Sequence, residues 1–215
     1  MSNTTPQTRE SEENTMLRII NETFNIYFKH GARRANKVNY FHKEIQNILK
    51  IYFPIANGFE VKLEQKVTSC NSSGKKQCDI VVFKDNTEYI ILPVKIIMTS
   101  YKKNKNNFWE NLTGEVTHLK WRNPNVHIIP INILINKTPC LNNNKRIKKF
   151  ENITISDINI YDELIRYNLC YDIINYIFEV EHIKKENEIF DKIHITNFDT
   201  NTPYRSFDSI MSSLY

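Results

Sequence analysis

Residues 78–96 decide the fold and read CDIVVFKDNTEYIILPVKI. Two apolar runs flank the segment KDNT, whose residues are typical of a tight turn, so the stretch predicts an antiparallel hairpin. In such a hairpin the start of the first strand lies opposite the end of the second. Asp79 and Lys95 are therefore expected to be neighbours, and strand alternation places both on the same face as Pro93. A lysine inside a buried strand is costly, which makes Lys95 a candidate for function.

Helical and strand periodicities surround this hairpin in a regular order. The expected elements are helices over residues 14–30, 36–53 and 105–121, and strands over residues 59–67, 78–83, 88–98 and 126–135. Pro130 inside the last strand predicts a bulge or an unpaired position, because proline cannot donate to a ladder. The order is helix, three-stranded meander, helix and strand, which indicates an α/β fold.

Composition divides the chain into three parts. Residues 1–14 are polar and lack an apolar signal core, so we expect a disordered tail. Residues 15–138 hold the core with its N-terminal helices. Residues 139–215 are expected to form a helical part packed on the core, because residues 154–185 carry apolar side chains at helical spacing.

The bulk numbers suit one globular domain. The chain has 215 residues, 40% hydrophobic and 25% charged, and its net charge of +5 allows a polyanionic partner without requiring one. No apolar run approaches the roughly 20 residues that span a bilayer. The four cysteines and six histidines show no zinc-finger spacing. We therefore expect an intracellular protein with no membrane segment and with reduced thiols.

Asp79 and Lys95 on adjoining strands, within this order of elements, resemble the PD-(D/E)xK nuclease superfamily, to which many restriction endonucleases belong. The resemblance covers residues 38–136. It implies a restriction-endonuclease-like core with flanking helices, in which the aspartate and a second acid bind Mg²⁺ and the lysine orients or activates the attacking water. The chain departs from the family at Pro93, which stands where the family has an acid and cannot bind a metal. The resemblance then implies either a dead site or an acid supplied from elsewhere, as some members supply it from the following helix.

Two glutamates of the helix expected over residues 105–121 could supply this acid. Glu115 lies on nearly the same line as the apolar Leu112 and Leu119, so it is expected to face the sheet. Burial there would be costly unless the carboxylate pairs or binds a cation. Glu110 lies off that line but closer in sequence to the lysine strand. Glu115 is favoured, and Glu110 stays as the alternative.

Three further groups are candidates for the metal site. The backbone carbonyl of Val94 is expected to join Asp79 and the displaced glutamate as a ligand. Glu64, on the polar face of the first strand, could bind the metal directly or through water, and it could equally be a solvated strand residue. Glu44 occupies the place of an extra acid in the family, but it lies off the apolar stripe and is expected at the surface.

Basic and amide side chains directly after the lysine strand are candidates for DNA contacts. The segment SYKKNKNN, residues 100–107, is expected to be a loop beside the site. The candidates are Lys102, Lys103, Asn104, Lys105 and Asn107, with Arg33 and Arg34 between the first two helices as a second patch. Lysines suit phosphates, and asparagines suit phosphates or base edges. A solvated basic turn is the alternative interpretation.

The resemblance thus implies a Mg²⁺-dependent endodeoxyribonuclease acting on double-stranded DNA. A type II restriction enzyme, acting as a homodimer that cuts both strands of a short specific site, is the most specific version of this prediction. The alternative is a catalytically degenerate protein of the same fold that binds nucleic acid or a protein partner, and Pro93 is the residue that favours it.

Overall fold

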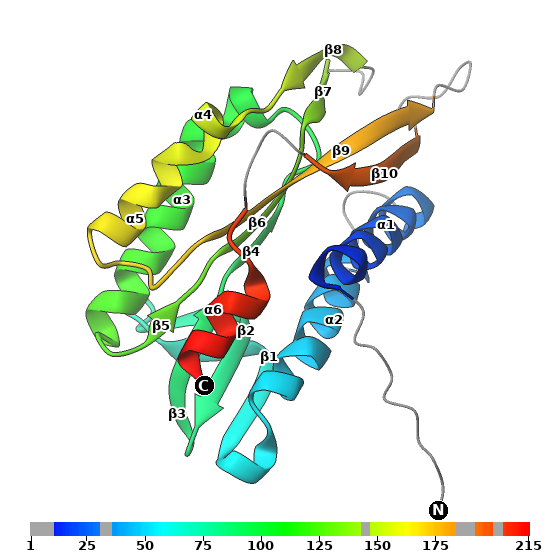
Figure 1. The fold of residues 1–215 in the computed structure, drawn as a ribbon. Coiled ribbons are helices and arrows are strands. Elements are labelled where there is room, and N and C mark those ends of the chain that lie inside the picture. Colours follow the sequence, from blue (N-terminus) through cyan, green and yellow to red (C-terminus); the bar gives the residue numbers. More distant parts are fainter. Residues whose placement is uncertain (1–10, 31–35, 143–146, 184–191, 200–203) are drawn as a thin grey trace, which may run out of the picture.

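The computed structural model describes residues 11–30, 36–142, 147–183, 192–199 and 204–215, which form three layers with sheet between helices (Figure 1). The elements in chain order are α1 (Glu12–His30), α2 (Asn36–Tyr52), η1 (Ile55–Asn57), β1 (Phe59–Thr68), β2 (Lys75–Lys84), β3 (Thr87–Leu92), β4 (Val94–Ile96), α3 (Tyr101–Arg122), β5 (His127–Ile128), β6 (Ile131–Ile135), β7 (Lys137–Leu141), β8 (Ile147–Asn152), α4 (Ile155–Ile158), η2 (Asn159–Asp162), α5 (Glu163–Arg166), β9 (Ile174–Ile183), β10 (Lys192–Phe198) and α6 (Phe207–Leu214). The expected α/β class is confirmed. Within these ranges, no helix combines the length and apolarity needed to cross a lipid bilayer.

The expected meander is present and builds the first sheet, whose strand order is β1-β2-β3-β5. β1 pairs antiparallel with β2, and β2 pairs antiparallel with β3. The β2–β3 turn contains Asp85 and Asn86, whose φ angles are 49° and 64°. Left-handed backbone at both turn positions matches the twist of a two-residue hairpin, and these two residue types tolerate it.

Two prolines divide strands that the sequence predicts to be continuous. The third expected strand is split at Pro93 into β3 and β4, and the fourth is split at Pro130 into β5 and β6. The parallel pairs β3–β5 and β4–β6 share one register, which places Pro93 beside Pro130. Neither proline has an N–H to donate at this proline seam, although the Pro93 carbonyl still accepts a hydrogen bond from the N–H of Ile131 at 2.8 Å. The second sheet, in the order β10-β9-β6-β4, continues on the far side of the seam (Figure 1).

Helices cover both faces of the two sheets. α1, α2 and α6 pack on one face, and α3, α4 and α5 pack on the other (Figure 1). Alternate residues of the central strands serve the two layers: Ile133 and Tyr176 join the core under α1 and α2, whereas Leu134 and Ile177 join the core under α3. β6 and β9 are therefore buried on both faces.

The prediction of a helical C-terminal part is wrong. β9 pairs in parallel with β6 at the centre of the second sheet, and β10 pairs antiparallel with β9. The helices described in this part, α4, η2, α5 and α6, have 4, 4, 4 and 8 residues. The boundary expected after residue 138 falls inside β7. The physical reason is that a strand buried on both faces lacks polar alternation, so its apolar residues also fit helical spacing.

α1 begins earlier than the sequence indicates. Residues 1–10 of the expected tail lie outside the described residues, but Glu12 and Asn14 belong to the first turn of α1. The Glu12 carboxylate accepts hydrogen bonds from the backbone N–H of Phe207 at 2.9 Å and of Asp208 at 3.1 Å, and from the Tyr176 hydroxyl at 2.8 Å. These partners anchor the helix start, and they are too far along the chain for a local pattern to reveal.

Candidate functional site

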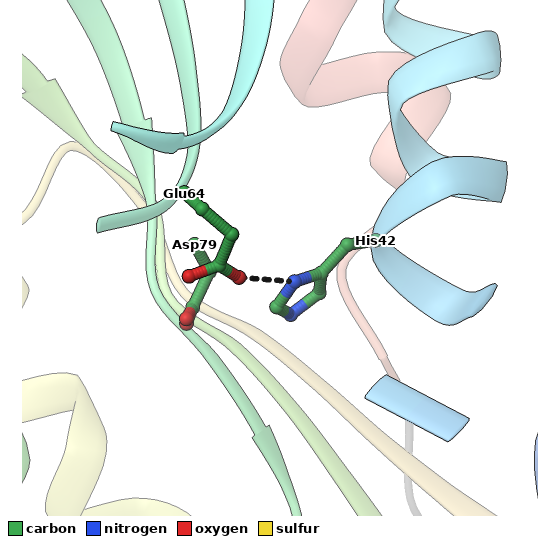
Figure 2. A group of neighbouring side chains, drawn as sticks. All are labelled: His42, Glu64 and Asp79. Carbon is green, nitrogen blue, oxygen red and sulfur yellow. Dashed lines mark hydrogen bonds and ion pairs between the residues drawn. The ribbon is translucent and has the colours of Figure 1, made fainter. Parts of the chain in front are cut away.

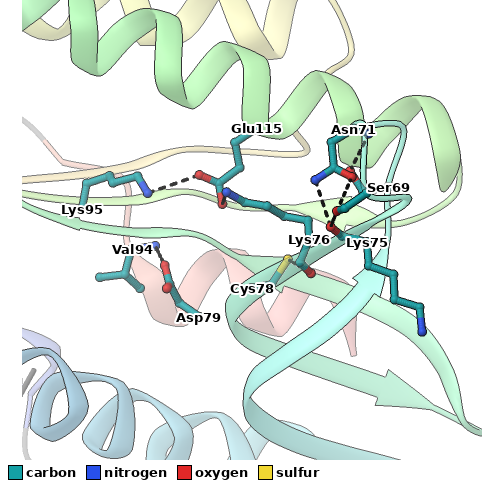
Figure 3. Close-up of polar contacts among 10 residues, drawn as sticks. Ser69, Asn71, Lys75, Lys76, Cys78, Asp79, Val94, Lys95 and Glu115 are labelled. Atoms are coloured by element: carbon teal, nitrogen blue, oxygen red, sulfur yellow. Dashed lines mark hydrogen bonds and ion pairs between the residues drawn. The ribbon is translucent and has the colours of Figure 1, made fainter.

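The candidate site lies at the proline seam, where β3 ends at Leu92 and β4 begins at Val94. The β2–β3 register continues to place Asp79 opposite Pro93. The Asp79 carboxylate accepts a hydrogen bond from the backbone N–H of Val94, with 2.7 Å between nitrogen and Oδ2 (Figure 3). The N–H and C=O of one strand residue point to the same side of the strand. The Val94 carbonyl therefore also points to the side of β4 on which Asp79 lies.

Three residues from three elements meet at this point, and we call His42 of α2, Glu64 of β1 and Asp79 of β2 the acidic half of the site (Figure 2). One potential ligand atom from each lies within 4.8 Å of the other two. His42 Nδ1 is 3.1 Å from Glu64 Oε1, and the Gln77 amide donates to Glu64 Oε2 over 2.7 Å. The group therefore brings two carboxylates and one imidazole to a single place.

The backbone of β1 is unusual at Glu64. Its φ of 52° lies in the left-handed region, and β1 pairs regularly with β2 on either side of it, which places Glu64 opposite Asp79. A non-glycine residue in this region costs about 1–3 kcal/mol, and such outliers cluster at ligand and active sites. The outlier coincides here with the acidic half.

The three members of the acidic half differ in burial: His42 is buried, Asp79 is half-buried and Glu64 is exposed. Desolvation raises the pKa of Asp79; the Val94 N–H and the charges of His42 and Lys95 oppose this rise, and Glu115 adds to it. His42 is 1% exposed, and its Nε2 is buried without a hydrogen-bond partner among the described residues. The carboxylate oxygens of Glu64 and Asp79 and a ring nitrogen of His42 suit a divalent cation.

Glu115 and two lysines occupy the α3 side, and we call Lys76, Lys95 and Glu115 the lysine half of the site (Figure 3). Lys95 Nζ lies 3.2 Å from Glu115 Oε2, and Lys76 Nζ lies 3.7 Å from Glu115 Oε1. The Glu115 side chain is 9% exposed, whereas 34% of Lys95 and 39% of Lys76 remain exposed. Two ammonium groups against one carboxylate leave a net positive charge that solvent can reach, which suits a phosphate.

The predicted glutamates Glu115, Glu110 and Glu44 lie in three different surroundings. Glu115 points to the sheet and meets Lys95, whereas Glu110 is exposed on α3. Glu115 stands beside the lysines and not within the ligand group that contains Asp79. Glu44 pairs with Arg18 of α1 over 3.5 Å, so it faces the α1–α2 contact.

The segment predicted to be a basic loop instead forms the first turns of α3, so that prediction is wrong. Tyr101 is fully buried and stacks on Phe108, with 6.0 Å between ring centroids, which packs the helix start against the core. A helix N-terminus disfavours lysines, and for this reason the sequence reads as a loop. Lys102 Nζ lies 3.2 Å from Asp157, and Lys105 Nζ lies 3.8 Å from it.

Other candidate DNA contacts have separate surroundings. The Asn104 amide donates to the carbonyl of Ser100 over 3.0 Å, whereas Lys103 and Asn107 are exposed. The start of α3 lies about 20 Å from Glu115 along the helix axis, at a rise of about 1.5 Å per residue. Arg33 and Arg34 lie outside the described residues.

Sequence reasoning missed two members of the site. His42 lies on the stripe of α2 that also carries the buried Ile45 and Leu49, so an imidazole on an apolar face was the available signal. Lys76 was missed because the sequence predicts a loop over residues 71–76, whereas β2 begins at Lys75. Boundary errors of this size are common in sequence interpretation.

Comparisons with known proteins supply no relative. The chain matches no protein-family model, no curated protein and no solved structure. The function is therefore argued from the geometry of the site.

Proposed function

We propose that the protein is a metal-dependent endonuclease that hydrolyses phosphodiester bonds of double-stranded DNA. One observation carries the proposal: the acidic half and the lysine half adjoin, because Asp79 groups with His42 and Glu64 and also accepts from the N–H of Val94, the residue before Lys95. Phosphodiester hydrolysis requires neutralisation of an anionic phosphate and an activated water. The acidic half suits a cation and the lysine half suits a phosphate, so together they meet both requirements.

The chain's own side chains have distinct tasks in this proposal. Lys95 is partly exposed and lies beside Glu115, so its ammonium is held in place while it donates to a phosphate oxygen or to the attacking water. Lys76 offers a second ammonium from the other side of Glu115. Glu115 is a positioning residue, because both of its oxygens face lysines.

The donor set of this structure fits a divalent ion. Asp79, Glu64 and the Val94 carbonyl offer hard oxygen donors, so Mg²⁺ is one ion that they would hold. When bound, such an ion neutralises phosphate charge and makes a nearby water more acidic. Asp79 and Glu64 then serve to hold the ion, and Lys95 serves the phosphate.

The arrangement of elements supports the finer version of the proposal. The meander β1–β3, the helix α3 and the strand β6 follow the order expected of a restriction-endonuclease-like core. A type II restriction enzyme with two copies, one for each DNA strand, is the specific form that we propose.

Cleavage of supercoiled plasmid tests this function. Unmodified protein with Mg²⁺ or Mn²⁺ is expected to give nicked, linear or discrete products, and none with chelator. Asp79→Asn and Lys95→Ala should reduce cleavage to background. Asp162→Asn and Lys149→Ala change the same residue types at positions outside both halves, so they should cut normally. Equal cleavage by all variants, or none by folded unmodified protein on several DNAs, would refute the proposal.

Pro93 favours a second candidate function, a nuclease-fold protein that binds DNA without cutting it. Proline supplies no ligand where the resembled family has an acid, and Glu115 is engaged by two lysines. This candidate predicts salt-dependent retention of DNA, weakened by Lys76→Ala and Lys95→Ala, with no metal-dependent products.

A further inference from the structure

The spacing of the acidic half matches what one bound ion requires. Ligands at about 2.1–2.2 Å from a metal lie about 3.0 Å apart when adjacent and about 4.3 Å apart when opposite. His42 Nδ1 and Glu64 Oε1 are 3.1 Å apart, and one ligand atom from each of His42, Glu64 and Asp79 lies within 4.8 Å of the others. A small contraction would bring all three onto one ion.

The His42 ring supplies an independent reason for a cation. If Nδ1 carries the proton and donates to Glu64, the buried Nε2 keeps a lone pair that no described residue satisfies. If Nε2 carries the proton, the Nδ1 lone pair faces the Glu64 carboxylate at 3.1 Å, which is repulsive unless a cation lies between them. A cation held between Nδ1 and the carboxylates makes the second arrangement favourable, because the Nδ1 lone pair then binds the ion.

Imidazole also limits which metal is preferred. Mg²⁺ favours oxygen ligands and dehydrates reluctantly, whereas first-row transition ions accept mixed nitrogen and oxygen ligands. We propose that His42, Glu64 and Asp79 form a binding site for a divalent transition-metal ion of the Mn²⁺ type, in preference to Mg²⁺. The role of this ion in DNA cleavage rests on the proposed function, but its binding does not.

The test is Mn²⁺ binding to the full chain without DNA, measured from the loss of the free-ion signal in electron paramagnetic resonance. We expect one Mn²⁺ per chain, displaced by Mg²⁺ only at about tenfold or greater excess over Mn²⁺. His42→Ala and Glu64→Gln should each weaken Mn²⁺ about 10–100-fold, and Asp79→Asn at least as much. Glu60→Gln, on the same strand as Glu64 but paired with Lys62, is the matched control and should bind Mn²⁺ normally.

His42 is buried, so His42→Ala is compared only if its circular dichroism matches the unmodified protein. Glu64 is 44% exposed in its side chain, and Glu64→Gln keeps the test decisive if His42→Ala fails to fold. No stoichiometric Mn²⁺, or Mn²⁺ binding that Asp79→Asn abolishes while the folded His42 and Glu64 variants leave it intact, would overturn the inference. Mg²⁺-dependent plasmid cleavage could persist in either case, so the two proposals fail separately.

Discussion

The two halves of the site hold similar acids in opposite surroundings. Asp79 meets an imidazole and a second carboxylate, and burial raises its pKa. Glu115 is also largely buried, but two lysines stand within 3.2 Å and 3.7 Å of its oxygens. The acidic half sets two carboxylates against one imidazole, whereas the lysine half sets two ammonium groups against one carboxylate.

This difference indicates which ligand suits each half of the site. An acid that pairs with lysines is already satisfied within the protein, so Glu115 organises the cations around it. An acid that stands beside another acid gains most from an added cation. The β2–β3 pairing ends at Leu92, which leaves the Val94 N–H available to the Asp79 carboxylate at this edge.

The largest expected effect separates the two lysines. Lys95→Ala should lower the rate of plasmid cleavage about 10²–10³-fold, as loss of one positioned charge-stabilising donor does. Lys76 is farther from Glu115 and should matter about tenfold or less. Single-turnover cleavage under saturating Mn²⁺ measures both rates. Equal losses would mean that the lysine half acts only as a diffuse positive surface.

A smaller effect on stability distinguishes the two glutamates of α3. Glu115→Gln leaves two lysines without their partner, so the free energy of unfolding should fall by about 1–3 kcal/mol. Glu110→Gln changes an exposed residue and should stay within about 0.5 kcal/mol. Urea unfolding without added metal provides the comparison. A stable Glu115→Gln variant would show that the lysine half does not depend on its acid.

The start of α3 offers a test on DNA affinity. Asp157 holds Lys102 and Lys105; burial would raise the pKa of Asp157, but the Thr154 N–H and the Lys102 ammonium lower it. Asp157→Asn should release both lysines and tighten non-specific DNA binding several-fold. The slope of log K against log salt should steepen by up to about 2, or about 0.9 for each new phosphate contact. An unchanged slope would place this end of α3 away from DNA.

The smallest effect is a pH dependence of stability. Because the pKa of Asp79 is raised above its ordinary value of 3.8, the folded chain holds this proton more tightly than the unfolded chain. Its stabilising contribution is present below that value and is lost as pH rises through the raised pKa. Without metal, the stability of Asp79→Asn relative to the unmodified protein should therefore increase as the pH rises above about 4. Denaturation series at several pH values measure the difference, and a flat difference would contradict the assigned surroundings of Asp79.

The part of the fold that follows local patterns could be predicted from the sequence. Alternation in β1, the turn residues Asp85 and Asn86 and the apolar stripe of α2 are local signals, and each produced the expected element. β9 could not be predicted in this way, because burial on both faces removes the polar alternation that marks a strand. The division of strands at Pro93 and Pro130 depends on two distant prolines meeting in one register.

The parts of the site that depend on local geometry could also be predicted from the sequence. The hairpin brings Asp79 to β4, and helical spacing turns Glu115 toward Lys95, as geometry within one or two elements requires. His42 and Lys76 join only through packing of α2 and through the true start of β2, which no local spacing specifies. The division into two halves of unlike charge is therefore a property of the tertiary structure.

Crystals of the protein with a short DNA duplex and Mn²⁺, measured near the manganese absorption edge, would test the central claim most directly. The account predicts an anomalous peak among His42, Glu64 and Asp79, with a DNA phosphate beside Lys95. A manganese peak elsewhere, or a duplex lying away from the proline seam, would contradict it.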